Sequence, residues 1–138
     1  MKAYFAHPIN VYNTALENFL LEIINSLFCG EVENPNQPKH AAGYQRLKTE
    51  AGNGMLYYTQ EVLPNCKVCV FLAFRDGKIG AGVFKEIEFI FNRHGSIYEI
   101  LPTGRLMAVA DIEVLKGRIL SVDETKQRVY ADGATRPY

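Results

Sequence analysis

A glycine-rich segment followed by a glutamate is the part of this sequence best suited to chemistry. Gly77, Gly80 and Gly82 fall within six residues, and a backbone without side chains can approach a ligand closely. Glu86 follows, and we expect it in the first turn of a helix, where free amide groups and the helix dipole favour a negative charge. An ionised carboxylate at the mouth of a cleft is suited to nucleophilic attack. The segment therefore predicts a reactive Glu86 and a ligand held against Gly80 and Gly82.

Polar side chains also follow two other expected strands. His7 and Asn10 come after an apolar run that indicates a buried first strand. In an open parallel sheet, ligands bind beyond the carboxyl ends of the strands, near the point where the strand order reverses. His7 and Asn10 are therefore candidate ligand-binding residues. The same rule selects Asn13, Asn34, Asn36 and Gln37.

Alternating strands and helices must position these residues. Short apolar runs indicate strands, and apolar residues at helical spacing indicate helices. Thr14 and Glu17 have the spacing of a capping box at a helix start, and Gly30 can end that helix. We expect strands at residues 2–6, 31–34, 68–74 and 97–101, helices at 14–27 and 83–93, and a further helix that ends with residues 55–63.

This alternation predicts an α/β fold with a mostly parallel sheet and helices on both faces, because parallel strands need right-handed crossovers between them. Residues 118–130 resemble a β-hairpin. The last third of the chain is therefore expected to add strands instead of another crossover. The polar segment that precedes Gly54 has no clear pattern.

The composition limits both the fold and the partners. The chain has 138 residues, 48% of them apolar and 22% charged, which predicts one globular domain over residues 1–138. Fifteen basic and fifteen acidic residues give a net charge of zero, so we expect no binding to polymeric nucleic acid. The longest apolar run, residues 68–74, is far shorter than a membrane helix, and no secretory signal is visible. We therefore expect a cytoplasmic protein with no membrane partner.

Two of the three cysteines, Cys66 and Cys69, form a CxxC motif. An odd number of cysteines without a framework of spacings fits a reducing compartment. If both thiols lie on one strand, they point to opposite faces of the sheet, because residues three apart do so. No second pair of metal ligands accompanies them. We therefore expect neither a disulfide nor a metal site here.

Several of these segments resemble the nucleoside 2-deoxyribosyltransferase family. The resemblance covers about residues 2–101 and lies in Tyr4-Phe5-Ala6, in the apolar run 68–74, and in Gly82-Val83-Phe84-Lys85-Glu86-Ile87 before Gly95. Gly82 and Glu86 match the family signature of a glycine four residues before a glutamate, on the helix after the third strand. The resemblance implies a flavodoxin-like three-layer α/β/α fold, no cofactor or metal, and a homo-oligomer.

The resemblance also implies an enzyme that cleaves or transfers the N-glycosidic bond of a nucleoside or a nucleoside 5′-monophosphate. Glu86 would attack the anomeric carbon and form a glycosyl-enzyme ester, as in a retaining glycosidase. Tyr4 would place its hydroxyl beside Glu86, and Asp76 would be the acid that protonates the departing base. The preferred base, the sugar, and the choice between transfer and hydrolysis stay open.

A non-catalytic binding module is the alternative interpretation. Asp76 lies ten residues before Glu86, a longer spacing than the family uses, and Cys66-Lys67 stands where relatives often carry an acidic residue. Both departures would fit a cleft that holds a nucleotide or a nucleotide-derived signal without turnover.

Overall fold

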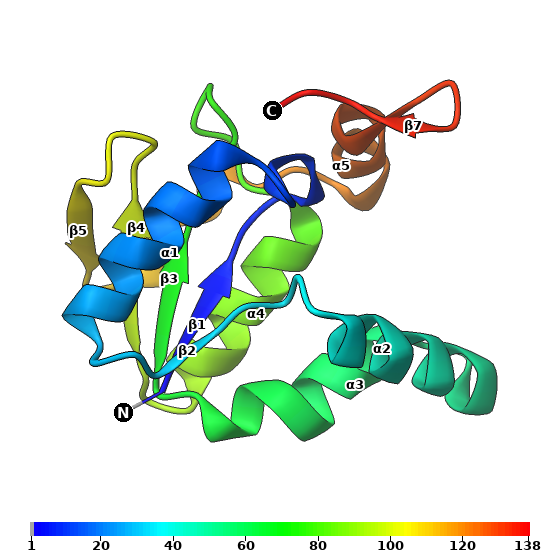
Figure 1. The fold of residues 1–138 in the computed structure, drawn as a ribbon, viewed down its shortest axis with the longest axis horizontal. Coiled ribbons are helices and arrows are strands. Elements are labelled where there is room, and N and C mark those ends of the chain that lie inside the picture. Colours follow the sequence, from blue (N-terminus) through cyan, green and yellow to red (C-terminus); the bar gives the residue numbers. More distant parts are fainter. Residues whose placement is uncertain (1) are drawn as a thin grey trace.

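A five-stranded sheet is the centre of the computed structural model, which describes residues 2–138 (Figure 1). The strands lie in the order β2-β1-β3-β4-β5, and β1 to β4 are parallel while β5 runs antiparallel to β4. The predicted α/β fold with a mostly parallel, flavodoxin-like sheet is therefore confirmed. The strands are β1 (Ala3–Ala6), β2 (Val32–Glu33), β3 (Val68–Phe71), β4 (Ser96–Ile100) and β5 (Leu106–Val109).

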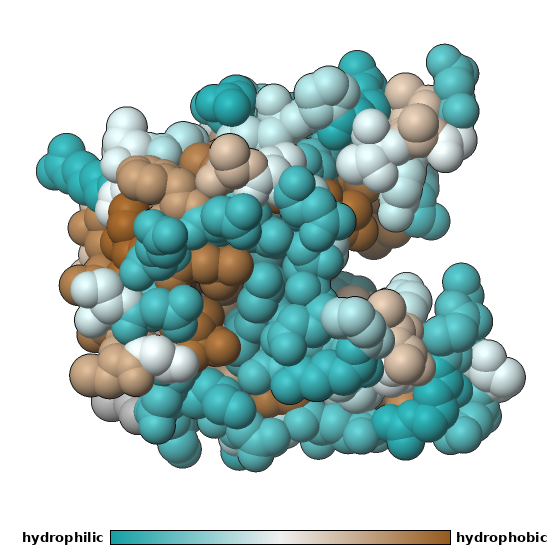
Figure 2. All heavy atoms as spheres, viewed as in Figure 1, coloured by the Kyte–Doolittle hydropathy of each residue, from teal (hydrophilic) through white to brown (hydrophobic). Residues whose placement is uncertain are grey.

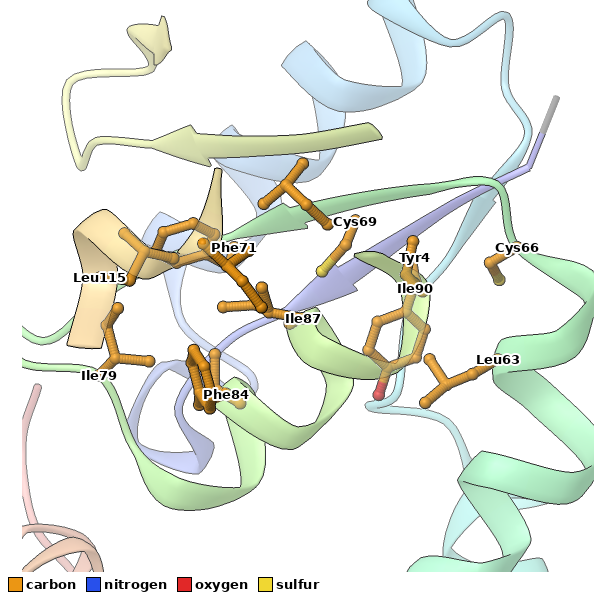
Figure 3. Packing of buried hydrophobic residues seen from close by; sticks show 14 of the residues in the cluster. Tyr4, Leu63, Cys66, Cys69, Phe71, Ile79, Phe84, Ile87, Ile90 and Leu115 are labelled. Carbon is orange, nitrogen blue, oxygen red and sulfur yellow. The ribbon is translucent and has the colours of Figure 1, made fainter. Parts of the chain in front are cut away.

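Helices cover both faces of the sheet, as expected. Successive residues of β1 point to opposite faces, so Phe5 packs with the cluster under α1 (Ala15–Leu27) while Tyr4 packs with the cluster under α4 (Ala81–Asn92). Burial of each large apolar side chain in these clusters stabilises the fold by about 1.5–3 kcal/mol. Figure 3 shows Tyr4 between α4 and the segment that carries Leu63. The pleat of β1 therefore directs Tyr4 toward the helix that carries the glutamate.

An arm of residues 38–65 extends from the β2 edge of the sheet (Figure 1). It contains α2 (Pro38–Ala51), α3 (Met55–Tyr57), a π-helical turn (Tyr58–Val62) and a 3₁₀ turn (Leu63–Asn65). The helical character expected for 55–63 is present, but α2 has no counterpart among the expected elements. Its buried residues are His40 and Gly43, so the helix shows no apolar stripe from which it could be predicted.

The C-terminal hairpin is present, but not at residues 118–130. Most of those positions belong to α5 (Val122–Val129), whose start is fixed by a capping box between Ser121 and Glu124, and residue 118 ends a 3₁₀ segment (Ile112–Arg118). The hairpin consists of β6 (Tyr130–Ala131) and β7 (Ala134–Thr135). Its turn residues Asp132 and Gly133 both have positive φ, 50° and 78°, as a tight two-residue hairpin turn requires.

The cysteines are free thiols, and the expectation of opposite faces for the CxxC pair is wrong. β3 begins at Val68, so Cys66 lies in the turn before the strand, and both Cys66 and Cys69 pack into the same core cluster (Figure 3). Burial raises the pKa of both thiols, to about 11 for Cys66. Within residues 2–138 there is no helix long and apolar enough to cross a membrane and no group of three potential metal ligands.

Candidate functional site

A cleft of about 610 Å³ lies at the carboxyl ends of the strands, where β1 and β3 lead to opposite sides of the sheet. Tyr4 and Glu86 lie at its floor, α5 contributes Thr125 from one side, and the 38–65 arm contributes Tyr44 from the other. Figure 2 shows the molecule hollowed between the segment of α5 and β7 and the arm. The walls therefore come from segments far apart in sequence.

The centre of the cleft is the pair Tyr4 and Glu86. The hydroxyl of Tyr4 donates a short hydrogen bond to Oε2 of Glu86. Helix α4 begins at Ala81 and not at residue 83, so Glu86 lies in its second turn instead of the first. There it turns toward β1 and is only 8% exposed.

Burial raises the pKa of Glu86 to about 8, against the opposing effect of the hydrogen bond from Tyr4. Burial and the neighbouring Glu86 also raise the pKa of Tyr4, well above its usual value. Tyr4 therefore keeps its proton, and Glu86 exchanges its own near neutral pH. A carboxyl with such a raised pKa can be ionised for one step of a reaction. Its burial in the cleft keeps water away from it.

The two glycines predicted to approach a ligand both line the cleft, but for different reasons. A Cβ on Gly80 would lie 3.2 Å from Cγ2 of Thr125, and the next amide, of Ala81, donates a 2.9 Å hydrogen bond to Thr125 Oγ1. Gly80 therefore makes room for α5. A Cβ on Gly82 would meet no atom of residues 2–138 within 4 Å, so Gly82 opens directly onto the cleft.

His7 also lines the cleft, and both of its ring nitrogens are engaged elsewhere. Nδ1 donates to the carbonyl of Phe5 at 2.8 Å, and Nε2 lies 2.7 Å from Oε2 of Glu17. Burial opposes ionisation of Glu17, but hydrogen bonds from His7, from Asn36 and from the backbone amide of Asn13 hold the pKa of that carboxyl below its usual value. His7 is thus a fixed wall residue that joins β1 to α1.

Asn10 does not line the cleft. Its Nδ2 donates to the carbonyls of Arg128 and Arg136, at 2.9 Å each. These bonds tie the C-terminal segment to the loop after β1. The sequence predicts a ligand-binding role for Asn10, but its side chain has a structural role instead. It holds the segment that carries Thr125 and Tyr130, and these two residues do line the cleft.

Asp76 lies outside the cleft lining as well. Its carboxylate accepts two hydrogen bonds from the guanidinium of Arg128, at 2.9 and 2.7 Å, and these hold its pKa below the usual value. Gly77 follows with φ 86°, so Asp76-Gly77 forms a tight turn. An exposed, ion-paired aspartate that favours ionisation is unsuited to protonate a departing base in the cleft.

Several cleft residues were not among those predicted from the sequence, and some of them come from the arm. They include Tyr44, Gln45 and Tyr58, together with Tyr12 and Tyr130 from other walls. Their positions depend on where α2 and α5 pack. No protein-family model, curated protein or solved structure matches this chain.

Proposed function

We propose that the protein cleaves or transfers the N-glycosidic bond of a nucleoside, or of a nucleoside 5′-monophosphate, with Glu86 as the nucleophile. The observation that carries this proposal is the buried Glu86, bonded to Tyr4 at the floor of a cleft large enough for a nucleoside. The resemblance of the segments around Tyr4, Gly82 and Glu86 to the nucleoside 2-deoxyribosyltransferases supports the same reaction.

In the proposed reaction, an ionised Glu86 oxygen forms a bond to the anomeric carbon. The bond from that carbon to the base nitrogen breaks, and its electron pair leaves with the base. Water, or a second base, then attacks the glycosyl ester and releases Glu86. Positive charge develops on the sugar in the transition state, and a carboxylate that bonds to the anomeric carbon stabilises that charge. The hydrogen bond from Tyr4 orients the carboxylate and favours its ionised form.

Release of free base tests this proposal. The protein is incubated with a panel of nucleosides and of their 5′-monophosphates, and the products are separated by chromatography. We expect base release by the wild type and a loss of at least about 10³-fold in Glu86→Gln, which keeps the shape of the side chain but not its nucleophilicity. Wild-type protein that releases no base from any compound, or a fully active Glu86→Gln variant, would contradict the proposal.

A binding module without turnover is a second candidate. It is favoured by the position of Asp76, which leaves Glu86 as the one carboxyl among the described residues that line the cleft, whereas a retaining glycosidase pairs two. A ligand that raises the melting temperature and is recovered intact would support this candidate. Quantitative recovery of a free base in the same sample would exclude it.

We further propose that the protein is cytoplasmic and self-associates. Its three cysteines are free thiols, and Phe19 and Leu27 lie exposed on α1 with exposed fractions of 45% and 54%. Light scattering after size-exclusion chromatography measures the oligomeric state. A monomer at all concentrations would contradict self-association.

A further inference from the structure

The side chains that line the cleft define a site for positive charge. Glu86 is its acidic group, five tyrosines contribute aromatic rings, and the lining within residues 2–138 contains neither lysine nor arginine. His7 also lines the cleft, but its ring bonds the Phe5 carbonyl and pairs with the carboxylate of Glu17, so it presents no unpaired positive charge to the cleft. Aromatic faces and a carboxylate both attract cations, and the attraction strengthens when water is excluded.

Glycines of the arm contact two tyrosine rings, of which Tyr44 lines the cleft and Tyr57 lies in the core beside it. A Cβ on Gly54 would lie 2.5 Å from the ring of Tyr44, and a Cβ on Gly43 would lie 2.1 Å from the ring of Tyr57. Neither glycine has a positive φ, so what excludes a larger residue at each position is the tyrosine ring beside it. The ring of Tyr44 therefore packs on Gly54, while Tyr44 is still 37% exposed.

Tyr44 and Tyr58 form an aromatic platform in the cleft, and Tyr58 is also a neighbour of Tyr4 in the pair of Tyr4 and Glu86. Its ring centroid lies 6.4 Å from that of Tyr44 and 6.5 Å from that of Tyr4, which bonds Glu86. A planar ring placed against Tyr44 and Tyr58 would lie next to the carboxylate. The exposed amide of Gln45 follows Tyr44 on the same helix and also lines the cleft, where it can bond to the edge of such a ring.

The leaving group gives an independent argument. A neutral purine or pyrimidine departs as an anion unless an acid protonates it. Asp76, the carboxyl expected for that task, is ion-paired with Arg128 outside the cleft. A base that already carries a positive charge needs no acid, because the electron pair from the broken bond neutralises it.

From these observations, and resting on the proposed function, we infer that the preferred substrates are nucleosides whose base is a cationic planar ring, such as a pyridinium or an N7-alkylated purine. Glu86 bonds to the anomeric carbon, the carbon–nitrogen bond breaks, and its electron pair returns to the positively charged ring. The base leaves as a neutral molecule without taking a proton. Water then adds to the anomeric carbon, which frees the carboxylate of Glu86 and passes one proton to the solvent.

Matched nucleosides test this inference. 7-Methyladenosine and adenosine differ by one methyl group and one positive charge, and base release from each is measured after subtraction of the spontaneous rate. We expect kcat/KM to be at least about 100-fold higher for 7-methyladenosine. Equal or faster cleavage of adenosine would overturn the inference while the proposed function stands.

A measurement of binding affinity distinguishes failure of the inference from failure of the proposed function. Nicotinamide riboside is cationic and its dihydro form is neutral, and the affinity of the protein for both is measured by calorimetry. We expect the cationic form to bind at least about tenfold more tightly to wild type, and this preference to shrink in Glu86→Gln. A preference for the cationic form without cleavage of any nucleoside would contradict the proposed function and leave the cationic site standing. Equal affinities would overturn the cationic site.

Variants of Tyr44 test its ring as part of the binding site, and a variant of Tyr98 is the control. Tyr44→Leu removes the ring and Tyr44→Phe keeps it, while Tyr98→Phe alters a tyrosine on the far side of the sheet. We expect Tyr44→Leu to reduce the affinity for nicotinamide riboside at least about fivefold, and Tyr44→Phe and Tyr98→Phe to retain it. An unchanged affinity in a folded Tyr44→Leu variant would overturn the assignment of Tyr44.

Discussion

The buried hydroxyl of Tyr4 in β1 donates a hydrogen bond to the buried carboxyl of Glu86, which lies 82 residues later in the chain, in α4. The strand pleat directs Tyr4 toward α4, and the start of that helix at Ala81 turns Glu86 back toward the strand. The contact therefore joins the first strand to the helix that follows the third strand, at the floor of the cleft. Burial raises the pKa of the Glu86 carboxyl, and this hydrogen bond opposes that larger effect.

Glu86 makes the stability of the fold depend on pH. Its pKa is about 8 in the folded protein and about 4.5 when exposed, so its contribution is complete below 4.5 and is lost as the pH rises through 8. We expect Glu86→Gln to gain stability relative to wild type between pH 5 and pH 8, by a few kcal/mol on the order of the pKa difference. Urea denaturation at both pH values measures it. A constant difference between the two proteins would show that Glu86 titrates normally.

The bond from Tyr4 should set the pH dependence of catalysis. A nucleophile must be ionised, so kcat/KM should rise with pH to a plateau with a midpoint near 8. Tyr4→Phe removes the hydrogen bond that lowers the pKa of Glu86, and the midpoint should move upward by about one unit. Tyr98→Phe is the matched control and should leave the midpoint in place. A lower midpoint in Tyr4→Phe would be inconsistent with this role.

Asp76 should be dispensable for the reaction. Its ion pair with Arg128 is exposed, so Asp76→Asn should lower the free energy of unfolding by less than about 1 kcal/mol. Base release should stay within about twofold of wild type, as for a residue outside the site. A loss of activity of about 100-fold in a folded variant would restore Asp76 as the catalytic acid.

Two glycine substitutions should have opposite effects on stability. Gly43→Ala places a Cβ 2.1 Å from the ring of Tyr57, so it should lower the free energy of unfolding by about 1–3 kcal/mol. Gly82→Ala adds a methyl group where residues 2–138 leave open space in α4, and should be neutral or stabilising by up to about 1 kcal/mol. Urea denaturation compares the two variants. A Gly43→Ala variant as stable as the wild type would mean that the ring of Tyr57 does not pack on Gly43.

The bonds of Glu17 should give the protein an acid-sensitive contact. Its pKa lies below the usual value in the folded state because His7, Asn36 and the Asn13 amide donate to it. This stabilisation is present above the unfolded pKa and is lost as the pH falls through the folded pKa. Glu17→Gln should cost about 1–3 kcal/mol at pH 7 and less at pH 4. An equal cost at both pH values would exclude the titration of Glu17 as its cause.

The sequence was enough to predict the α/β alternation, most of the strands and helices of the core, and the glycine segment that leads to Glu86. These features depend on local patterns, such as the apolar run at 68–74 and the spacing in α4. It did not indicate α2, because that polar helix buries only His40 and Gly43. Nor did the sequence indicate that Asp76 lies outside the cleft lining, where it pairs with Arg128.

Which groups meet in the cleft depends on how the elements pack together. Tyr4 and Glu86 are joined by the pleat of β1 and the start of α4, and Tyr44 reaches the cleft because α2 packs where Gly43 and Gly54 leave room for tyrosine rings. The raised pKa of Glu86 likewise follows from burial. Such contacts depend on packing between segments far apart in the chain, and the local spacing of residues does not encode them.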